Sequence, residues 1–300
     1  MKILMTGGTG LIGSAFITKY HHKYKFVVLT RDPNKSANLF PTSPNINFIA
    51  NLTDQIAIEQ FDAVINLAGE PIADNRWTLK RKRAICQSRW KLTNKLSQLI
   101  NEAENPPKVF ISGSAVGYYG RQGNTEINEN YKDINEEFSH KICKVWENKA
   151  LLASGRSRVC LLRTGIVLSS SGGALSKMLP AFKLCLGGKI STGHQYMSWI
   201  HIEDMVDGIE FLLNNQNCQG PFNLTAPKPV TNLEFTKALA KSLHRPSFAT
   251  VPAIALKLLL GEMSDLLLYG QNVLPERLLS EKFKFSYPNI NIAFADLHGK

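Results

Sequence analysis

Three glycines near the start of the 300-residue sequence have the spacing of a phosphate-binding turn. Gly7, Gly10 and Gly13 form the pattern G-x-x-G-x-x-G, which follows a short apolar run and opens a predicted helix. The first glycine allows a tight turn, the second lets the backbone approach a pyrophosphate, and the third lets helix and strand pack closely. The helix N-terminus adds N–H donors and a partial positive charge. The motif therefore predicts a dinucleotide-binding site.

The type of dinucleotide depends on the residues at the end of the second predicted strand, Thr30-Arg31-Asp32. An acidic residue at this place typically binds the ribose 2′-OH of NAD. Here Arg31 comes first, and its guanidinium can pair bidentately with a 2′-phosphate. Asp32 would repel that phosphate unless its side chain turns away. We therefore predict NADP as the cofactor.

Short apolar runs alternate with helix-like segments along the chain, a pattern typical of βαβ units. Runs such as Val64 to Ala68 are almost continuously hydrophobic, which favours strands buried on both faces. We predict an α/β fold with a Rossmann-type, doubly wound parallel sheet and a small C-terminal lobe. The predicted strands are Lys2 to Met5, Phe26 to Leu29, Ile46 to Ile49, Ala63 to Leu67, Val109 to Ile111, Val159 to Leu162 and Phe222 to Leu224.

Two stretches depart from this alternation. One is the Gly/Ser-rich segment at 169–173 with the Leu-rich region that follows it, and the other is the tail from about Arg245. We assign residues 1–244 to an NADP-binding Rossmann core, within which the segment 168–198 contributes to a substrate lobe. Residues 245–300 form the predicted C-terminal module.

The composition is that of a globular protein, with 44% hydrophobic residues and a formal net charge of +11. The longest apolar run, Val251 to Leu260, contains Lys257 and is shorter than the ~20 residues of a membrane-spanning helix. The apolar stretch at the N-terminus is too short for a secretory signal, so we expect a cytoplasmic protein without membrane contact. Five dispersed cysteines without a C-x-x-C pair argue against a disulfide framework and a zinc site, and we expect no metal.

Longer motifs point to a family. The chain resembles the extended short-chain dehydrogenase/reductases, and among them the bacterial epimerase-family proteins sometimes labelled nucleoside-diphosphate-sugar epimerases. The resemblance also includes that family's C-terminal module. It rests on the glycine motif and on residues 66–69, 67–74, 76–77, 88–89, 112–120, 163–168, 199–204, 260–262, 270–271 and 283–288.

The resemblance implies that NADP lies along the carboxyl ends of the strands. It places Leu11 and Ile12 under the pyrophosphate, Thr30 and Arg31 at the 2′-phosphate, Leu67 and Ala68 near the adenosine ribose, Arg89 at the phosphates, and Ile166 and Val167, in the loop after the sixth strand, beside the nicotinamide. It also allows for a homodimer.

Reductases of this class hold the substrate oxygen between a Ser and a Tyr, and a Lys four residues after the Tyr lowers the pKa of the Tyr. Ser114 matches the serine, although its hydroxyl could instead cap the following helix. The Tyr-x-x-x-Lys pair is expected in residues 139–143, which read Ser-His-Lys-Ile-Cys. Three interpretations remain: Tyr118 acts as the acid, Lys141, Lys144 or His140 does so, or the chemistry is lost.

Two further groups of residues invite functional interpretations. The segment His201-Ile-Glu-Asp204 could hold a metal, but we favour Asp204 as a helix N-cap and His201 as a buried hydrogen-bonding residue. Residues 76–95 contain eight Lys and Arg and no acidic residue. They form either a solvated helix face or a site for a phosphate-bearing ligand, and we do not expect nucleic acid because no recognised nucleic-acid module is present.

The sequence thus predicts an NADP-dependent oxidoreductase or epimerase that acts on a small carbonyl or nucleotide-sugar-like substrate. The predicted catalytic residues are Ser114 and Tyr118. The alternative is a non-catalytic NADP-binding sensor or interaction protein with the same fold, which the missing Tyr-x-x-x-Lys pair favours.

Overall fold

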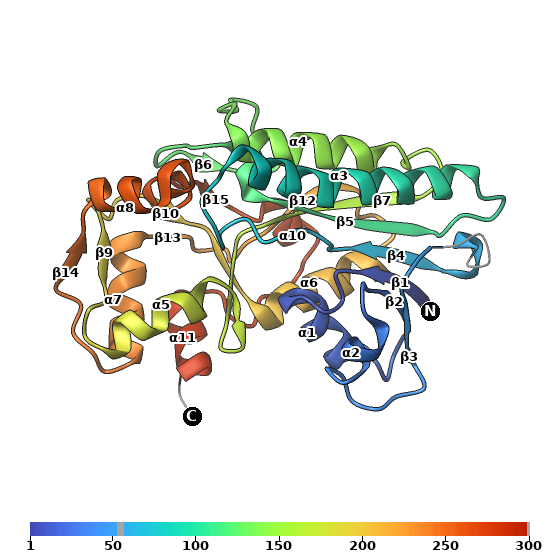
Figure 1. Cartoon of the computed structure of the whole chain (residues 1–300), viewed down its shortest axis with the longest axis horizontal. Coiled ribbons are helices and arrows are strands. Elements are labelled where there is room, and N and C mark those ends of the chain that lie inside the picture. The colour runs from blue at the N-terminus through green and yellow to red at the C-terminus, as the bar shows by residue number, and fades with distance from the viewer. Residues whose placement is uncertain (53–56, 299–300) are drawn as a thin grey trace.

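The computed structural model describes residues 1–52 and 57–298. Its centre is a sheet of seven parallel strands in the order β12-β7-β5-β4-β1-β2-β3 (Figure 1). All seven predicted strands form this sheet, so the predicted fold class is confirmed. The strands are β1 (Lys2–Thr6), β2 (Lys25–Leu29), β3 (Ile46–Ile49), β4 (Ala63–Asn66), β5 (Val109–Ala115), β7 (Arg158–Thr164) and β12 (Gly220–Leu224).

Helices cover both faces of the sheet, which explains why its central strands are apolar on both sides. The helices α3 (Leu79–Glu102) and α4 (Phe138–Leu151) cover one face, where Leu4 and Val64 pack with Leu96. The helices α1 (Leu11–Tyr20) and α6 (Ile202–Asn214) cover the other, where Ile3 packs in a cluster with Phe16. The short helix α2 (Pro33–Ala37) lies beside β3 at the sheet edge (Figure 1).

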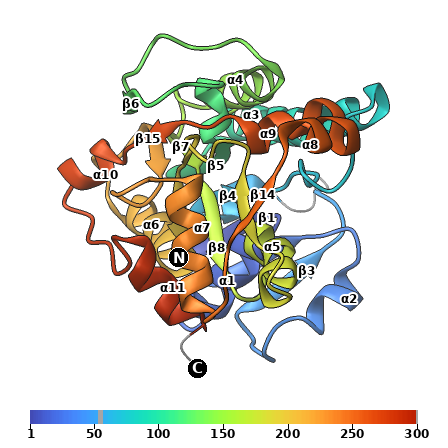
Figure 2. The ribbon, with the colours of Figure 1, turned by 90° about the vertical axis from the view of Figure 1, so that its left-hand side faces the viewer.

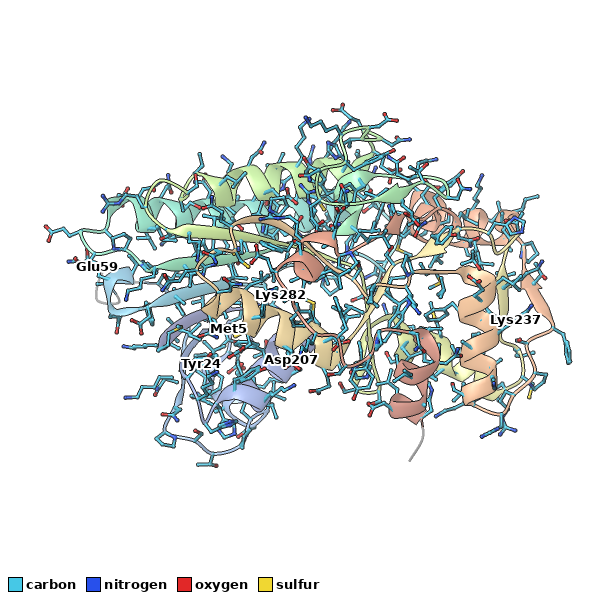
Figure 3. The ribbon with its side chains drawn as sticks, turned by 180° about the vertical axis from the view of Figure 1, so that it is seen from behind. Met5, Tyr24, Glu59, Asp207, Lys237 and Lys282 are labelled. Atoms are coloured by element: carbon cyan, nitrogen blue, oxygen red, sulfur yellow. The ribbon has the colours of Figure 1, made fainter. Side chains whose placement is uncertain are left out.

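Side chains of α1 also hold α6 by polar contacts. Tyr20 donates a hydrogen bond of 2.6 Å to Asp207, and Lys19 forms ion pairs with Asp207 and Glu203. Figure 3 shows Asp207 in the core half of the molecule and Lys237 in the lobe.

The order of the strands reverses at β1, with β2 on one side and β4 on the other. Ligands of open α/β sheets bind at such a reversal, beyond the carboxyl ends of the strands.

A second lobe lies beyond these strand ends (Figure 2). Its core joins Leu175 and Phe182 to Phe235 and Phe294. Its strands pair as β8 with β11, β9 with β14 and β10 with β13. The elements of this part are β8 (Ile166–Ser169), α5 (Gly173–Lys183), β9 (Gly188–Ile190), β10 (Tyr196–Met197), β11 (Trp199–His201), β13 (Val230–Thr231), α7 (Asn232–Ser242), β14 (Ala249–Val251), α8 (Ala253–Leu260), η3 (Gly261–Ser264), α9 (Asp265–Leu268) and α11 (Ile290–His298).

The chain after α9 runs back along the core. There β15 (Asn272–Val273) pairs with β6 (Glu126–Ile127), and α10 (Glu276–Ser280) lies beside β12. Two further 3-10 turns are η1 (Ile58–Gln60) and η2 (Val116–Tyr119). None of the helices in the described part of the chain is long and apolar enough to cross a membrane. The domain boundary at residue 244 stays a prediction.

Candidate cofactor and substrate site

The glycine motif forms a turn that only glycine can make. Gly7 has a φ of +70°, and a Cβ on it would lie 2.5 Å from the carbonyl carbon of Leu67. A Cβ on Gly13 would lie 2.3 Å from the carbonyl oxygen of Gly7. Gly10 is the N-cap of α1 and provides no side chain to bond its first N–H groups. These groups are therefore available to an anion, so the turn fits a dinucleotide pyrophosphate.

The end of β2 presents a cation without a competing carboxylate. Asp32 is the N-cap of α2, and its carboxylate accepts a hydrogen bond of 3.0 Å from the backbone N–H of Lys35. Arg31 is exposed and forms no ion pair with any described residue. Thr30 Oγ1 lies 2.8 Å from Ser36 Oγ, which fixes the first residue of this segment. The arrangement fits a 2′-phosphate because the carboxylate of Asp32 serves α2 instead.

Arg89 brings a second cation to the same edge of the sheet. Its Nη1 donates to the carbonyl oxygens of Glu70 and Ile85 across 3.0 and 3.1 Å, and its guanidinium lies over the ring of Trp146. A Cβ on Gly69 would lie 2.9 Å from Arg89 Cζ, so the glycine gives this side chain room. Burial lowers the pKa of Arg89, and within residues 1–52 and 57–298 no carboxylate pairs with it. Such a cation favours a phosphate.

A cavity of about 410 Å³ lies between the strand ends and the lobe. Ile12, Leu67, Arg89, Ser114 and Ile166 line its core side. Elements of the lobe line the other side, with side chains from α5, β9, β10 and the segment 265–271. One cavity therefore contains five of the residues predicted from the sequence, and it has the size of a small-molecule site.

Ile166 and Val167 differ in their placement from the sequence-based expectation. They were expected in a loop, but they lie in strand β8, which pairs with β11. Gly165 makes the preceding turn possible, because a Cβ on it would lie 2.4 Å from the carbonyl oxygen of Ser198. Ile166 lines the cavity, whereas Val167 packs against the hydrophobic core.

Ser114 belongs to a buried polar network at the base of the cavity. It is the sixth residue of β5, and its Oγ donates a hydrogen bond of 2.6 Å to Glu147 Oε1 on α4. Arg163 on β7 holds the same carboxylate, with Nε and Nη2 each 2.9 Å from its oxygens. The alternative that Ser114 caps the following helix is wrong, because the N-cap of η2 is Ala115.

Tyr118 lies outside the residues that line the cavity. Its ring stacks on the guanidinium of Arg163, whose Cζ is 3.6 Å from the ring centroid, and its ring also contacts His140. The other candidates for the missing acid are also elsewhere. His140 is buried against the backbone oxygen of Tyr118, Lys141 is exposed, and Lys144 pairs with the exposed Glu136.

The positions of the missing Tyr-x-x-x-Lys pair are occupied by Ser139 and Cys143, and both line the cavity. Ser139 Oγ donates to Glu137 Oε1 across 2.7 Å. Burial, together with the nearby Glu147, raises the pKa of the Cys143 thiol to about 12. A neutral thiol cannot lower the pKa of a neighbouring hydroxyl as an ammonium group does.

Glu147 and Arg163 were not predicted as site residues from the sequence. A signal for Glu147 was present, because Ser139, Cys143 and Glu147 recur at intervals of four and so lie on one face of α4. The signal for Arg163 was weaker. It is a single charged residue at the end of the apolar run that forms β7. Their pairing could only be found from the fold, which brings α4 and β7 together around β5.

The segment 201–204 has a structural role that differs in detail from the expectation. His201, and not Asp204, is the N-cap of α6, and its Nδ1 accepts from the backbone N–H of Glu203. Asp204 instead accepts hydrogen bonds from the backbone N–H groups of Ser286 and Tyr287. The described residues contain no group of three or more His, Cys, Asp or Glu that could hold a metal ion.

The basic segment lies mainly on α3, and several of its charges have specific contacts. Arg81 pairs with Glu70 and Lys82 with Glu262, while Arg89 lines the cavity. Two of the apolar residues expected to face inward do so, since Ile85 is fully buried and the indole of Trp90 donates to the carbonyl oxygen of Ile142, whereas Leu79 is exposed.

The fold and this site together define a Rossmann-type protein with a second lobe over its dinucleotide-binding edge. The model of the NAD dependent epimerase/dehydratase family matches residues 3–224, and a domain of unknown function matches residues 251–297. The chain therefore belongs to the NAD dependent epimerase/dehydratase family.

Individual relatives match over the whole chain. An epimerase family protein of Arabidopsis thaliana, the chloroplastic homolog of SDR39U1, is 38% identical over 298 residues, which are 98% of this chain and 85% of that protein. The crystal structure of human epimerase family protein SDR39U1 with NADPH has a TM-score of 0.89 at 29% identity, with both chains fully covered. A nucleoside-diphosphate sugar epimerase from Corynebacterium glutamicum has a TM-score of 0.77 at 28% identity, over all of this chain and 58% of that one.

Proposed function

We propose that this protein is an NADP-dependent oxidoreductase that interconverts a hydroxyl and a carbonyl group on a small molecule bound between the core and the lobe. The observation that carries the proposal is the shared cavity. Ser114 and Ile166 line it together with Ile12 of the helix that follows the glycine-rich turn, and side chains of the lobe line its opposite side. Cofactor and substrate would therefore meet at Ser114.

The preference for NADP over NAD rests on two features of the structure and one relative. Arg31 is free of ion pairs among the described residues, and the carboxylate of Asp32 is engaged by α2. The human relative was solved with NADPH. A phosphate on the ribose gains a cation at this place, and the carboxylate of Asp32 is held by the N-terminus of α2.

Bound NADP would supply or accept the hydride at its nicotinamide. The chain contributes the position of the substrate oxygen, because the hydroxyl of Ser114 is fixed by Glu147 at the end of β5. When a substrate alcohol is oxidised, its carbon gives up the hydride and its hydroxyl proton is released to water. Lys141, Lys144, His140 and Tyr118 are not among the residues of the cavity wall, so the proposal assigns none of them a proton-transfer role.

The second candidate is an NADP-binding sensor without hydride transfer. Ser139 and Cys143 favour it, because they replace the acid and the lysine that reductases of this class use. The two candidates share the cofactor site and differ only in turnover, so a single experiment separates them.

That experiment first measures NADPH binding by the change in its fluorescence, and then the oxidation of NADPH by a panel of carbonyl compounds. The oxidoreductase predicts turnover that falls at least ~100-fold in Ser114→Ala, within the range for loss of a positioned group. Binding of NADPH without turnover across the panel favours the sensor. Absence of NADPH binding contradicts both.

A further inference from the structure

The lobe side of the cavity is built from mostly apolar side chains, and Asp265 is the charged residue among its described members. Met178 on α5, Ile190 on β9 and Met197 on β10 line it, and Leu266 and Leu267 close it from the segment after η3. Tyr196 and Tyr269 add two aromatic rings. A surface of this composition favours ligands that lose little hydration when they bind.

The amide side chains and the serine hydroxyl on this wall already have partners in the protein. Gln195 donates to the backbone oxygens of Ile190 and Leu267, across 3.1 and 3.0 Å. Ser198 donates to the backbone oxygen of Gln271 and accepts from the N–H of Val273. The remaining amides behave alike: Asn232 accepts from the N–H of Ile190, and Gln271 donates to the oxygen of Gly120. These side chains form part of the wall, and fewer of their hydrogen-bond donors and acceptors are left for a ligand.

The carboxylates that line the cavity also have partners within the protein. The carboxylates of Glu137 and Asp265 are both paired with Arg121, across 2.9 and 3.0 Å, and the guanidinium of Arg121 stacks on Tyr269. Among the lining residues that the structure describes, Arg89 is the only cation, and it lies on the core side beside Trp146. A nucleoside diphosphate carries charges that must be paired when they are buried. The lobe side offers no cation for them.

Ser114 defines the polar end of the ligand. Glu147 is held by two hydrogen bonds from Arg163, and an ionised carboxylate can only accept hydrogen bonds. The proton of Ser114 is therefore directed to Glu147, 2.6 Å away, and the oxygen of this cavity-lining residue remains a hydrogen-bond acceptor. A ligand hydroxyl can donate to that oxygen, whereas a carbonyl group cannot accept a hydrogen bond from a hydroxyl whose proton is bound to Glu147.

We propose that the substrate is an uncharged, largely apolar alcohol that donates its hydroxyl proton to Ser114 in a hydrogen bond, and that this protein does not use nucleoside-diphosphate sugars. This inference takes the position of the cofactor from the proposed function. It adds the class of substrate, which follows from the side chains that line the cavity.

The test uses the full chain saturated with NADP⁺, after NADP⁺ binding has been measured separately. Apolar alcohols from cyclohexanol to 2-decalol, their matching ketones and UDP-glucose are titrated calorimetrically. We expect binding of the alcohols to strengthen with ring size, each ketone to bind at least ~10-fold more weakly than its alcohol, and UDP-glucose not to bind at millimolar concentration. Binding of UDP-glucose as tight as that of the best alcohol, or binding of no alcohol, would overturn the proposal.

Two variants that each introduce a carboxylate test where the alcohol binds. Met178→Asp puts a carboxylate into the apolar wall, and Leu186→Asp puts the same charge on an exposed leucine of the same lobe outside the cavity. We expect at least a ~10-fold loss of alcohol affinity in the first and wild-type affinity in the second. Equal effects in both would contradict this location. Because NADP⁺ binding is measured in each variant, failure of the cofactor site is distinguished from failure of this inference.

Discussion

Ser114 on β5 donates a hydrogen bond of 2.6 Å to Glu147 on α4, and Glu147 is in turn paired with Arg163 on β7. Both members of the ion pair are 5% exposed at their side chains. The network therefore joins the carboxyl end of β5 to α4 and β7 through buried side chains. Burial of a charge is tolerated here only because its partner is buried with it.

Removing one member of this pair should be costly. Glu147→Ala leaves the guanidinium of Arg163 buried without its carboxylate, and we expect the free energy of unfolding to fall by about 3–5 kcal/mol. Urea denaturation followed by circular dichroism measures it. The control is Glu136→Ala, which breaks the exposed pair with Lys144 and should leave the unfolding curve in place. Similar curves for both variants would contradict the role of Glu147.

Arg31 should decide between the two nicotinamide cofactors. In Arg31→Ala we expect NADPH affinity to fall about 10- to 100-fold, the range for a charge-assisted hydrogen bond, while NADH affinity stays within about twofold. Fluorescence titration at low salt measures both affinities. Arg83→Ala removes an exposed arginine of α3 and is the matched control. A parallel loss for both cofactors would argue against a 2′-phosphate contact.

The glycine turn offers a second test of the cofactor site. A Cβ at position 13 would lie 2.3 Å from the backbone oxygen of Gly7, so Gly13→Ala must push α1 away from β1 and should abolish NADPH binding at micromolar concentration. Gly155→Ala is the control, because a Cβ at position 155 has nothing within 4 Å. Retained binding in Gly13→Ala would show that the cofactor does not rely on this turn.

Acidification should destabilise the protein through His201. Burial lowers the pKa of His201, although Asp296 lies 3.4 Å from its Nε2 and acts in the opposite direction. Below about pH 6.5 the unfolded chain therefore binds a proton at this residue that the folded chain does not, so stability is lost as the pH falls. His201→Asn keeps a helix-capping side chain and removes the titration.

The measurement is urea denaturation of both proteins between pH 7 and pH 5. We expect the free energy of unfolding to fall more steeply with decreasing pH in the wild type than in His201→Asn. Burial raises the pKa of Asp204, which favours the folded state on acidification, but this contribution is common to both proteins. Identical pH profiles would refute the assignment.

The sheet could be predicted from the sequence because its strands are locally encoded. Runs such as Ala63 to Leu67 are apolar except for one residue, Asn66, and each is bounded by turn or helix signals. The glycine turn was equally accessible, because Gly7 and Gly13 are required by backbone contacts that recur wherever a strand enters a helix so tightly. The apolar runs and the contact between Gly7 and Gly13 involve residues that are close together in the sequence.

The walls of the cavity could not be predicted in the same way. Met178, Tyr196 and Leu267 come from three separate segments, and only the docking of the lobe brings them together. The same holds for the partner of Ser114, since Glu147 is distant in the sequence and meets it only through the packing of α4 on β5. Short strands such as β8 were missed because Ile166 and Val167 pair with β11, outside the main sheet.

The central claim is that hydride transfer takes place in the cavity at Ser114. The most direct measurement is a single turnover of protein loaded with NADPH deuterated at one face of C4 in the presence of a ketone of the decalol series, with the product alcohol analysed by mass spectrometry. We predict that deuterium from one face only appears on the carbinol carbon, and that Ser114→Ala transfers it at least ~100-fold more slowly. Full NADPH occupancy with no deuterium in the product from NADPH labelled at either face would contradict the claim.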